Sequence, residues 1–166
     1  MPIPDRGARR PMNVYILRHA KAEFGSKNED PPVSEEGERQ LLGVLKLATG
    51  SLGFKPTLVV TSPILRARNT ADIVKKRIGG GLEVIVDDCL LPESKPKEVV
   101  DFLSTRKKEE SVVLISHMPL IFELLYGLIG GRGEVELLNG SIAAVGFKGK
   151  PQSGKGKLLW LVQPKV

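Results

Sequence analysis

The 166 residues of the chain are enough for one domain with a substantial hydrophobic core, and a second domain is not expected. The composition, 41% hydrophobic and 27% charged, is that of an ordinary globular protein, and no apolar stretch approaches the roughly 20 residues that cross a bilayer. The single cysteine, Cys89, excludes an intramolecular disulfide and a cysteine-rich zinc site. We therefore expect a cytoplasmic protein that has no membrane partner.

The net charge of +6 is concentrated near the two ends of the chain. Residues 1–11 carry a net charge of +2 and residues 148–166 one of +5, so the segment between them is near −1. A nucleic-acid-binding protein is expected to carry its basic residues on the body of the fold, so no nucleic-acid partner is expected and solubility explains the excess. Residues 1–11 lack the apolar segment of a secretory signal, and we interpret them as a flexible extension before a single domain over residues 12–166.

The predicted elements alternate between strand and helix over most of the chain. We expect strands at residues 12–17, 58–61, 82–86 and 112–115, and helices at residues 35–49, 63–78, 96–107 and 119–129. Ser34 is a predicted helix cap, and Ser62 with Pro63 is expected to begin the second helix. Two further strands, 141–147 and 157–162, flank a connector rich in Gly, Pro and Lys. This order predicts a three-layer α/β/α sandwich with a mostly parallel mixed sheet and a C-terminal antiparallel hairpin.

Two arginines and both histidines of the chain lie at the ends of predicted strands. Arg18 and His19 follow the first strand, Arg66 lies just beyond the second, and His117 follows the fourth. Ligands of open α/β sheets bind at the carboxyl ends of the strands. We therefore expect these four side chains to form one site.

These residue types suit the transfer of a phosphoryl group. The planar guanidinium groups of Arg18 and Arg66 can grip phosphate oxygens, and Arg66 also lies near a helix N-terminus that favours an anion. Guanidinium groups nearby lower the pKa of an imidazole and keep it neutral, so His19 is the candidate nucleophile. His117 is then placed to bond a phosphoryl oxygen in the transition state, whereas Arg68 is expected to face solvent.

Each of these residues also has a purely structural interpretation. Arg66 could be a surface arginine of an amphipathic helix, and the histidines could cap a strand end or a helix. Glu93, in the loop after the third strand, is a candidate general acid, although a solvated glutamate explains it equally well. Lys21 could add charge at the mouth of the site, with an exposed lysine as the simpler interpretation. No clustering of carboxylates or histidines indicates a metal, and no cofactor is expected.

Three segments resemble the histidine phosphatase superfamily, which includes phosphoglycerate mutases and many phosphomonoesterases. They are Arg18-His19, residues 62–71 and Ser116-His117. Residues 33–37, 113–120 and 140–145 are most similar to the SixA-type phosphohistidine phosphatases of that superfamily. The resemblance implies a covalent phosphohistidine at His19, a phosphoryl group held by Arg18, Arg66 and His117, and no requirement for a metal.

Two positions depart from the family pattern. Ala20 stands where many members have glycine, and Glu93 lies in the region of the proton-donor glutamate of mutase-like members without its surrounding motif. A phosphohistidine substrate leaves as an imidazole and depends less on an enzyme acid than an alkyl phosphate does. Protein phosphohistidine is therefore the expected substrate.

Two alternatives remain open at this point. One is a phosphomonoesterase of the same superfamily that acts on a small phosphorylated metabolite, and the other is a non-catalytic phosphate-binding adaptor. The expected partner is accordingly a phosphorylated protein or metabolite. The sequence leaves the oligomeric state open, with a monomer as one option.

Overall fold

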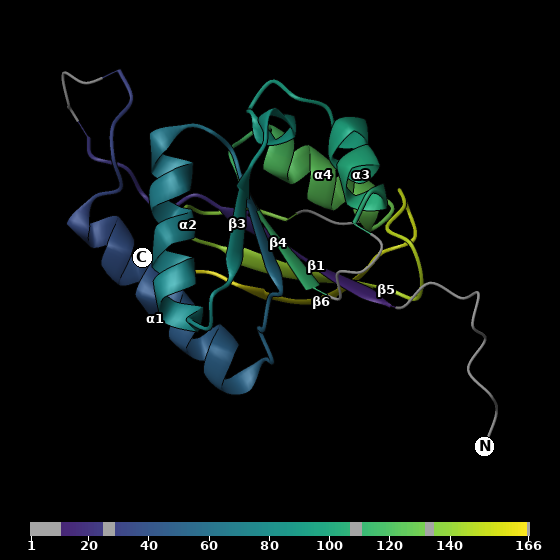
Figure 1. Ribbon diagram of the computed structural model, residues 1–166, viewed down its shortest axis with the longest axis horizontal. Helices are drawn as coiled ribbons and strands as arrows, with labels where there is room; N and C mark the ends of the chain where they lie inside the picture. Colours follow the sequence, from purple (N-terminus) through teal and green to yellow (C-terminus); the bar gives the residue numbers. More distant parts are fainter. Residues whose placement is uncertain (1–10, 25–28, 107–110, 132–134, 166) are drawn as a thin grey trace.

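A computed structural model describes residues 11–24, 29–106, 111–131 and 135–165, and these residues form a six-stranded sheet with helices on both faces (Figure 1). Except for Pro11, the predicted N-terminal extension lies outside the described residues. The strands are β1 (Met12–Arg18), β2 (Leu58–Thr61), β3 (Glu83–Val86), β4 (Ser111–Ser116), β5 (Ile142–Phe147) and β6 (Lys157–Val162). The helices are α1 (Glu35–Ser51), α2 (Leu65–Ile78), α3 (Pro96–Ser104) and α4 (Leu120–Leu128), with a short 3₁₀ turn, η1 (Asp88–Leu90).

The strand order β3-β2-β4-β1-β5-β6 confirms the predicted mixed sheet and its C-terminal hairpin. The pairs β1–β4, β2–β4 and β2–β3 are parallel, whereas β5 is antiparallel to both β1 and β6. Arg18 pairs with Ser116 in the β1–β4 register, and Thr61 pairs with Ile115 in the β2–β4 register. The carboxyl ends of β1, β2 and β4 therefore meet at one edge of the sheet.

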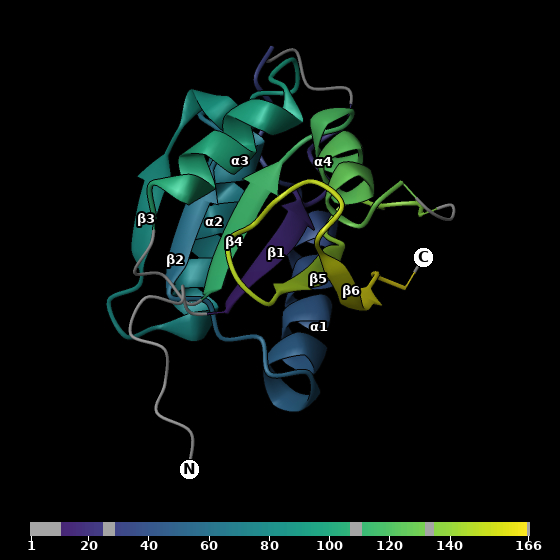
Figure 2. The same cartoon turned by 90° about the vertical axis from the view of Figure 1, so that its right-hand side faces the viewer.

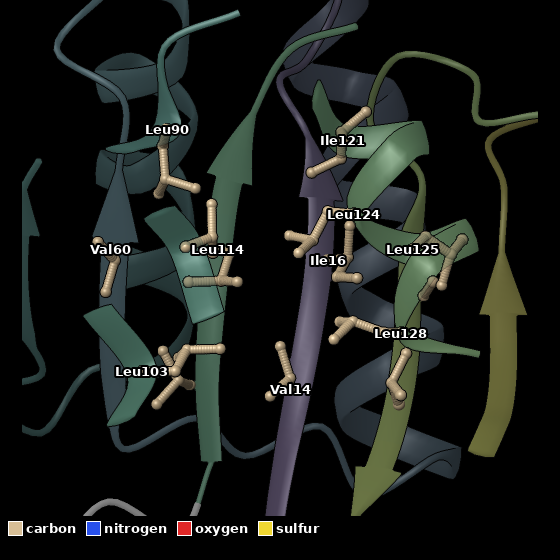
Figure 3. Packing of buried hydrophobic residues seen from close by; sticks show 14 of the residues in the cluster. Val14, Ile16, Val60, Leu90, Leu103, Leu114, Ile121, Leu124, Leu125 and Leu128 are labelled. Carbon is tan, nitrogen blue, oxygen red and sulfur yellow. The ribbon is translucent and has the colours of Figure 1, made fainter. Parts of the chain in front are cut away.

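Apolar side chains fill both spaces between the sheet and the helices. One core lies under α3 and α4, where Val14, Ile16 and Leu114 of the sheet pack against Leu124 and other helix residues (Figure 3). The other core lies under α1 and α2 on the opposite face of the sheet. Successive strand residues point to opposite faces, so strands buried on both faces appear in the sequence as continuous apolar runs. No helix in the described part of the chain has both the length and the apolar character needed to cross a membrane.

The predicted start of the second helix is wrong by two residues. Helix α2 begins at Leu65, and Ile64 is its N-cap residue without a side-chain cap. The hydroxyl oxygen of Ser62 accepts the N–H of Ile64, ahead of the helix, and contacts His117. The N–H of Leu65 donates to the carboxylate of Asp30, 3.2 Å away. A carboxylate from a distant loop thus replaces the local cap that the sequence pattern predicted.

Most other predicted boundaries agree with the structure to within two residues, but the third helix is shorter than predicted. Helix α3 ends at Ser104 rather than near residue 107. The N–H and the hydroxyl of Thr105 both donate to the carbonyl of Phe102, which closes the last turn. A side-chain hydroxyl that competes in this way for a backbone acceptor favours a helix end.

The start of α1 packs closely against the chain segment that follows His19. Ser34 caps the helix as predicted: its Oγ accepts the N–H of Gly37 and donates to the carbonyl of Lys21. A Cβ atom added at Gly37 would collide with the same Lys21 carbonyl oxygen. Glycine at this position lets the helix approach the backbone beside the site.

We expect Gly37→Ala to lower the free energy of unfolding by about 1–3 kcal/mol, because the clash involves backbone that cannot move freely. Gly43→Ala on the same helix is the matched control, since a Cβ atom there meets nothing within 4 Å. It should raise the free energy of unfolding by roughly 0.5–1 kcal/mol through helix propensity. Urea denaturation of both variants measures the difference, and equal effects would contradict the packing argument.

Candidate active site

The structure brings the predicted site residues together at the carboxyl edge of the sheet. The arrowheads of β1 and β4 point to the same end of the sheet in Figure 2, and His19 and His117 follow them directly. The centroids of the two imidazole rings are 4.9 Å apart. The Nε atom of Arg66, on the first turn of α2, lies 3.3 Å from Nε2 of His19.

The hydrogen bonds of His19 define which ring nitrogen is free. Its Nδ1 lies 2.8 Å from the carbonyl oxygen of Ala20, which can only accept, so Nδ1 carries the hydrogen. Nε2 therefore has an unshared electron pair, and the Nε–H of Arg66 donates to it. A neutral imidazole with its lone pair beside a guanidinium group is suited to attack an electrophile that the guanidinium also binds.

The backbone around His19 is fixed by partners from three distant elements. The His19 N–H donates to the carbonyl of Ser116 over 3.0 Å, and its carbonyl accepts from Nδ2 of Asn139 over 3.1 Å. The next amide, of Ala20, donates to Oγ1 of Thr70 on α2 over 2.9 Å. These bonds restrict the backbone that carries the imidazole and so hold the ring in a defined position.

The imidazole of His117 is held at one end by Ser62. The hydroxyl oxygen of Ser62 accepts the N–H of Ile64 over 3.3 Å and lies 2.8 Å from Nε2 of His117. The hydroxyl keeps its own hydrogen to donate, and in the tautomer whose Nε2 accepts it the ring hydrogen of His117 lies on Nδ1. That Nδ1 is buried and has no hydrogen-bond partner among the described residues.

Arg18 contributes a second buried nitrogen that has no partner among the described residues. Its Nη1 donates to the carbonyl of Leu137 over 2.7 Å, whereas its Nε is buried and unpartnered within the described part of the chain. Burial lowers the pKa of this guanidinium group. A buried polar atom without a partner costs about 1–3 kcal/mol, so two of them beside two guanidinium groups indicate a place for an anionic ligand.

Both histidines are kept neutral at physiological pH. Burial lowers the pKa of His19 to about 4, although its bond to Ala20 acts in the opposite direction. Burial lowers the pKa of His117 to about 3, and the charge of a protonated His19 would lower it further. The positive charges of Arg66 and Arg18 act in the same direction on both rings.

The remaining predicted residues lie outside this cluster. Glu93 is exposed in the turn between η1 and α3, and its carboxylate makes none of the hydrogen bonds or ion pairs of the described residues. Lys21 is paired with Glu36, with Nζ 2.8 Å from the carboxylate. Arg68 is exposed, as predicted from its spacing to Arg66.

Three residues that hold the site together were not identified as such from the sequence. Ser62 was interpreted as a helix cap, and Thr70 and Asn139 were not singled out. Thr70 lies one turn after Arg66 on α2, so helical spacing is a signal that could have located it. Asn139 had no such signal, because it lies far from His19 in the sequence.

Among the described residues the cluster consists of two imidazoles and two guanidinium groups, without a carboxylate. Across the described residues, no group of three or more His, Cys, Asp or Glu side chains is arranged to hold a metal ion. The arrangement combines a nucleophilic nitrogen with positive charge and N–H donors. These are the components that phosphoryl transfer requires.

Comparison with known proteins agrees with this geometry. The family model of the histidine phosphatase superfamily (branch 1) matches residues 14–91. The phosphohistidine phosphatase SixA of Escherichia coli is 29% identical over 164 residues, which cover 92% of this chain and 94% of that protein. A SixA homolog of Haemophilus influenzae is 28% identical over 147 residues, which cover 83% of this chain and 90% of that protein.

Two solved structures of SixA proteins are similar to the chain in fold. A structure of the protein histidine phosphatase SixA in complex with tungstate superposes with a TM-score of 0.81 at 26% identity, covering 92% of this chain and 97% of that one. A structure from Agrobacterium tumefaciens, described as a SixA phosphohistidine phosphatase, shares the fold with a TM-score of 0.78 at 21% identity, covering 93% of this chain and 99% of that one.

The family model, the two curated relatives and the tungstate-bound structure all match the chain to the histidine phosphatase superfamily. Within that superfamily the SixA-type phosphohistidine phosphatases are similar to the chain over nearly its whole length.

The lowered pKa values of His19 and His117 predict an unusual acid titration. We expect both imidazoles to titrate below pH 5, compared with about 6.5 for an unperturbed histidine. Two-dimensional NMR of the imidazole C–H groups between pH 8 and pH 4.5 measures this directly, because the chain has two histidines to assign. A midpoint near 6.5 for either ring would contradict the buried, neutral arrangement.

The lowered pKa of His19 also makes the free energy of unfolding depend on pH, and this dependence is a second check on the buried, neutral imidazole. The unfolded chain takes up a proton on His19 as the pH falls through about 6.5, whereas the folded protein does so only near 4. Stability is therefore lost between these values, by on the order of 3 kcal/mol for His19. In His19→Asn the free energy of unfolding should fall less steeply over this range than in the wild type.

Proposed function

We propose that the protein is a phosphatase that hydrolyses phosphohistidine in proteins through a covalent phosphoryl intermediate on His19. The observation that carries the proposal is the state of Nε2 of His19, which is unprotonated and in contact with the guanidinium group of Arg66. The two curated relatives are named phosphohistidine phosphatases, which supports the same substrate for this chain. Tungstate, bound in one similar structure, is a tetrahedral oxyanion like phosphate.

In the first step Nε2 of His19 attacks the phosphorus atom of the substrate. A bond forms between phosphorus and Nε2, and the bond between phosphorus and the substrate ring nitrogen breaks, with its electron pair remaining on that ring. The hydrogen on Nδ1 of His19 stays in its bond to the Ala20 carbonyl, which supports the positive charge that develops on the ring. Arg18, Arg66 and Nδ1–H of His117 bind the phosphoryl oxygens.

In the second step a water molecule attacks the phosphorus atom, and the proton that the water gives up passes to a phosphoryl oxygen. The bond between phosphorus and Nε2 breaks, its electron pair returns to Nε2, and inorganic phosphate leaves. His19 is regenerated in its starting protonation state, because burial and the two arginines disfavour imidazolium. The same arrangement therefore serves both steps.

The chemistry of the leaving group favours phosphohistidine over alkyl phosphates. A substrate imidazole can carry a proton on its second ring nitrogen and leaves as a neutral molecule, whereas an alkoxide leaves poorly unless an acid protonates it. Glu93 is the candidate acid, and its exposed position off the cluster supports a minor role with a phosphohistidine substrate. The guanidinium groups of Arg18 and Arg66 supply the positive charge that binds the phosphoryl oxygens. We therefore propose that the reaction is metal-independent.

We also propose a cytoplasmic location. This rests on the cysteine content of the chain, which has one thiol and so forms no internal disulfide, as is usual in a reducing compartment.

A phosphoenzyme trapping experiment tests the nucleophile. We expect wild-type protein incubated with a labelled phosphohistidine peptide to acquire label that survives base and is lost in acid, as phosphoramidate bonds are. His19→Ala should acquire none, because it lacks the accepting nitrogen. His117→Ala is the matched control: it retains Nε2 of His19 and should still be labelled, about 100–1,000-fold more slowly. Label that persists in His19→Ala would overturn the proposal, provided circular dichroism shows that the variant is folded.

A substrate comparison tests the role assigned to the leaving group. One preparation is assayed with a phosphohistidine peptide, an aryl phosphate and an alkyl phosphate, and kcat/KM should fall in that order, by at least about 100-fold from first to last. Glu93→Gln should change the value for phosphohistidine less than about threefold. Hydrolysis of the alkyl phosphate at the phosphohistidine rate, unaffected by Glu93→Gln, would contradict this assignment.

A further inference from the structure

A cleft with a volume of about 600 Å³ lies beside the β5–β6 connector, away from the histidines. It is lined by Lys148, Lys150, Lys155, Lys157, Gln152 and Leu159, among other residues. Asn13, which also lines it, is at the amino end of β1, whereas His19 follows the carboxyl end of that strand. Figure 2 shows the connector arching in front of the sheet between the ends of β5 and β6. The cleft is therefore separate from the candidate active site.

The four lysines, referred to below as the cleft lysines, have no ion-pair partner in the described part of the chain. All four are exposed, none takes part in the ion pairs of the described residues, and no carboxylate lines the cleft. Two other lysines are paired, Lys21 with Glu36 and Lys97 with Asp101. Four like charges around one concave surface attract anions strongly.

The connector that presents these lysines is held in place by the end of α4. The N–H of Gly154 donates to the carbonyl of Gly127 over 2.9 Å, and the N–H of Gly156 donates to the carbonyl of Leu128 over 2.8 Å. A Cβ atom at Gly156 would meet Val145 and the Leu128 carbonyl, so the connector lies directly against the core. A loop fixed in this way loses little conformational entropy when a ligand binds.

The size and lining of the cleft indicate the kind of ligand. Its volume is within the roughly 300–1,000 Å³ of small-molecule sites. The ammonium groups suit several anionic groups on one molecule, the amides of Asn13 and Gln152 can hydrogen-bond, and the exposed side chain of Leu159 offers an apolar contact. We propose that the cleft binds a small organic polyphosphate, such as a nucleoside triphosphate, independently of the phosphatase site.

Lysine footprinting locates the binding. The full chain is acetylated with and without adenosine 5′-(β,γ-methylene)triphosphate, and the modified lysines are quantified by mass spectrometry. The cleft lysines should react at least threefold more slowly with the nucleotide present, whereas Lys75 and Lys76 on α2, which are equally exposed, should not change. Uniform protection of all lysines, or none at the cleft, would overturn the proposal.

Calorimetry with paired variants tests the affinity. Lys148→Gln combined with Lys157→Gln should weaken nucleotide binding at least tenfold and leave the rate of phosphohistidine hydrolysis within twofold of wild type. Lys75→Gln combined with Lys76→Gln is the matched control and should bind as the wild type does. If inorganic triphosphate bound as tightly as the nucleotide, the organic part of the ligand would contribute nothing and the proposal would be refuted. If an RNA oligonucleotide bound the same lysines more tightly than the nucleotide, the proposal of a small-molecule ligand would be refuted.

Discussion

The parallel pairing of β1 with β4 is the constraint on which the site depends. Arg18 lies opposite Ser116, and the N–H of His19 extends the ladder by one further bond to the Ser116 carbonyl. The residues that follow each strand are then His19 and His117, whose rings stand 4.9 Å apart. Because side chains alternate between the faces of a sheet, a slip of one residue in this register would separate the two imidazoles.

Burial gives the cluster its chemical character. His19 is 8% exposed and His117 is 2% exposed, and this desolvation keeps both rings neutral. The same burial leaves Nε of Arg18 and Nδ1 of His117 without acceptors among the described residues, which disfavours the folded state. The site thus combines an available nucleophile with polar atoms whose hydrogen bonding an anion completes. The apolar cores on both faces of the sheet offset the free-energy cost of burying these unpartnered atoms.

Helix α4 connects the two ends of the molecule that carry positive charge. Its first turn is tied to the site, since the N–H of Ile121 donates to the carbonyl of His117 over 2.9 Å. Its last carbonyls, of Gly127 and Leu128, accept amides of the connector that lines the lysine cleft. The nine residues of this helix therefore position both a histidine at the active edge and the loop at the opposite end.

The sequence by itself determined the alternation of strands and helices and the positions of Arg18, His19 and His117, because apolar runs and strand ends are local patterns. The role of Glu93 stays a prediction. Only the tertiary structure decided which partners these residues have. The cap of α2 comes from Asp30, and the partner of His117 is Ser62. Four lysines whose charge the sequence analysis attributed to solubility are found around one cleft. These contacts join segments far apart in the chain, so they depend on sheet order and loop paths that no short window of sequence encodes.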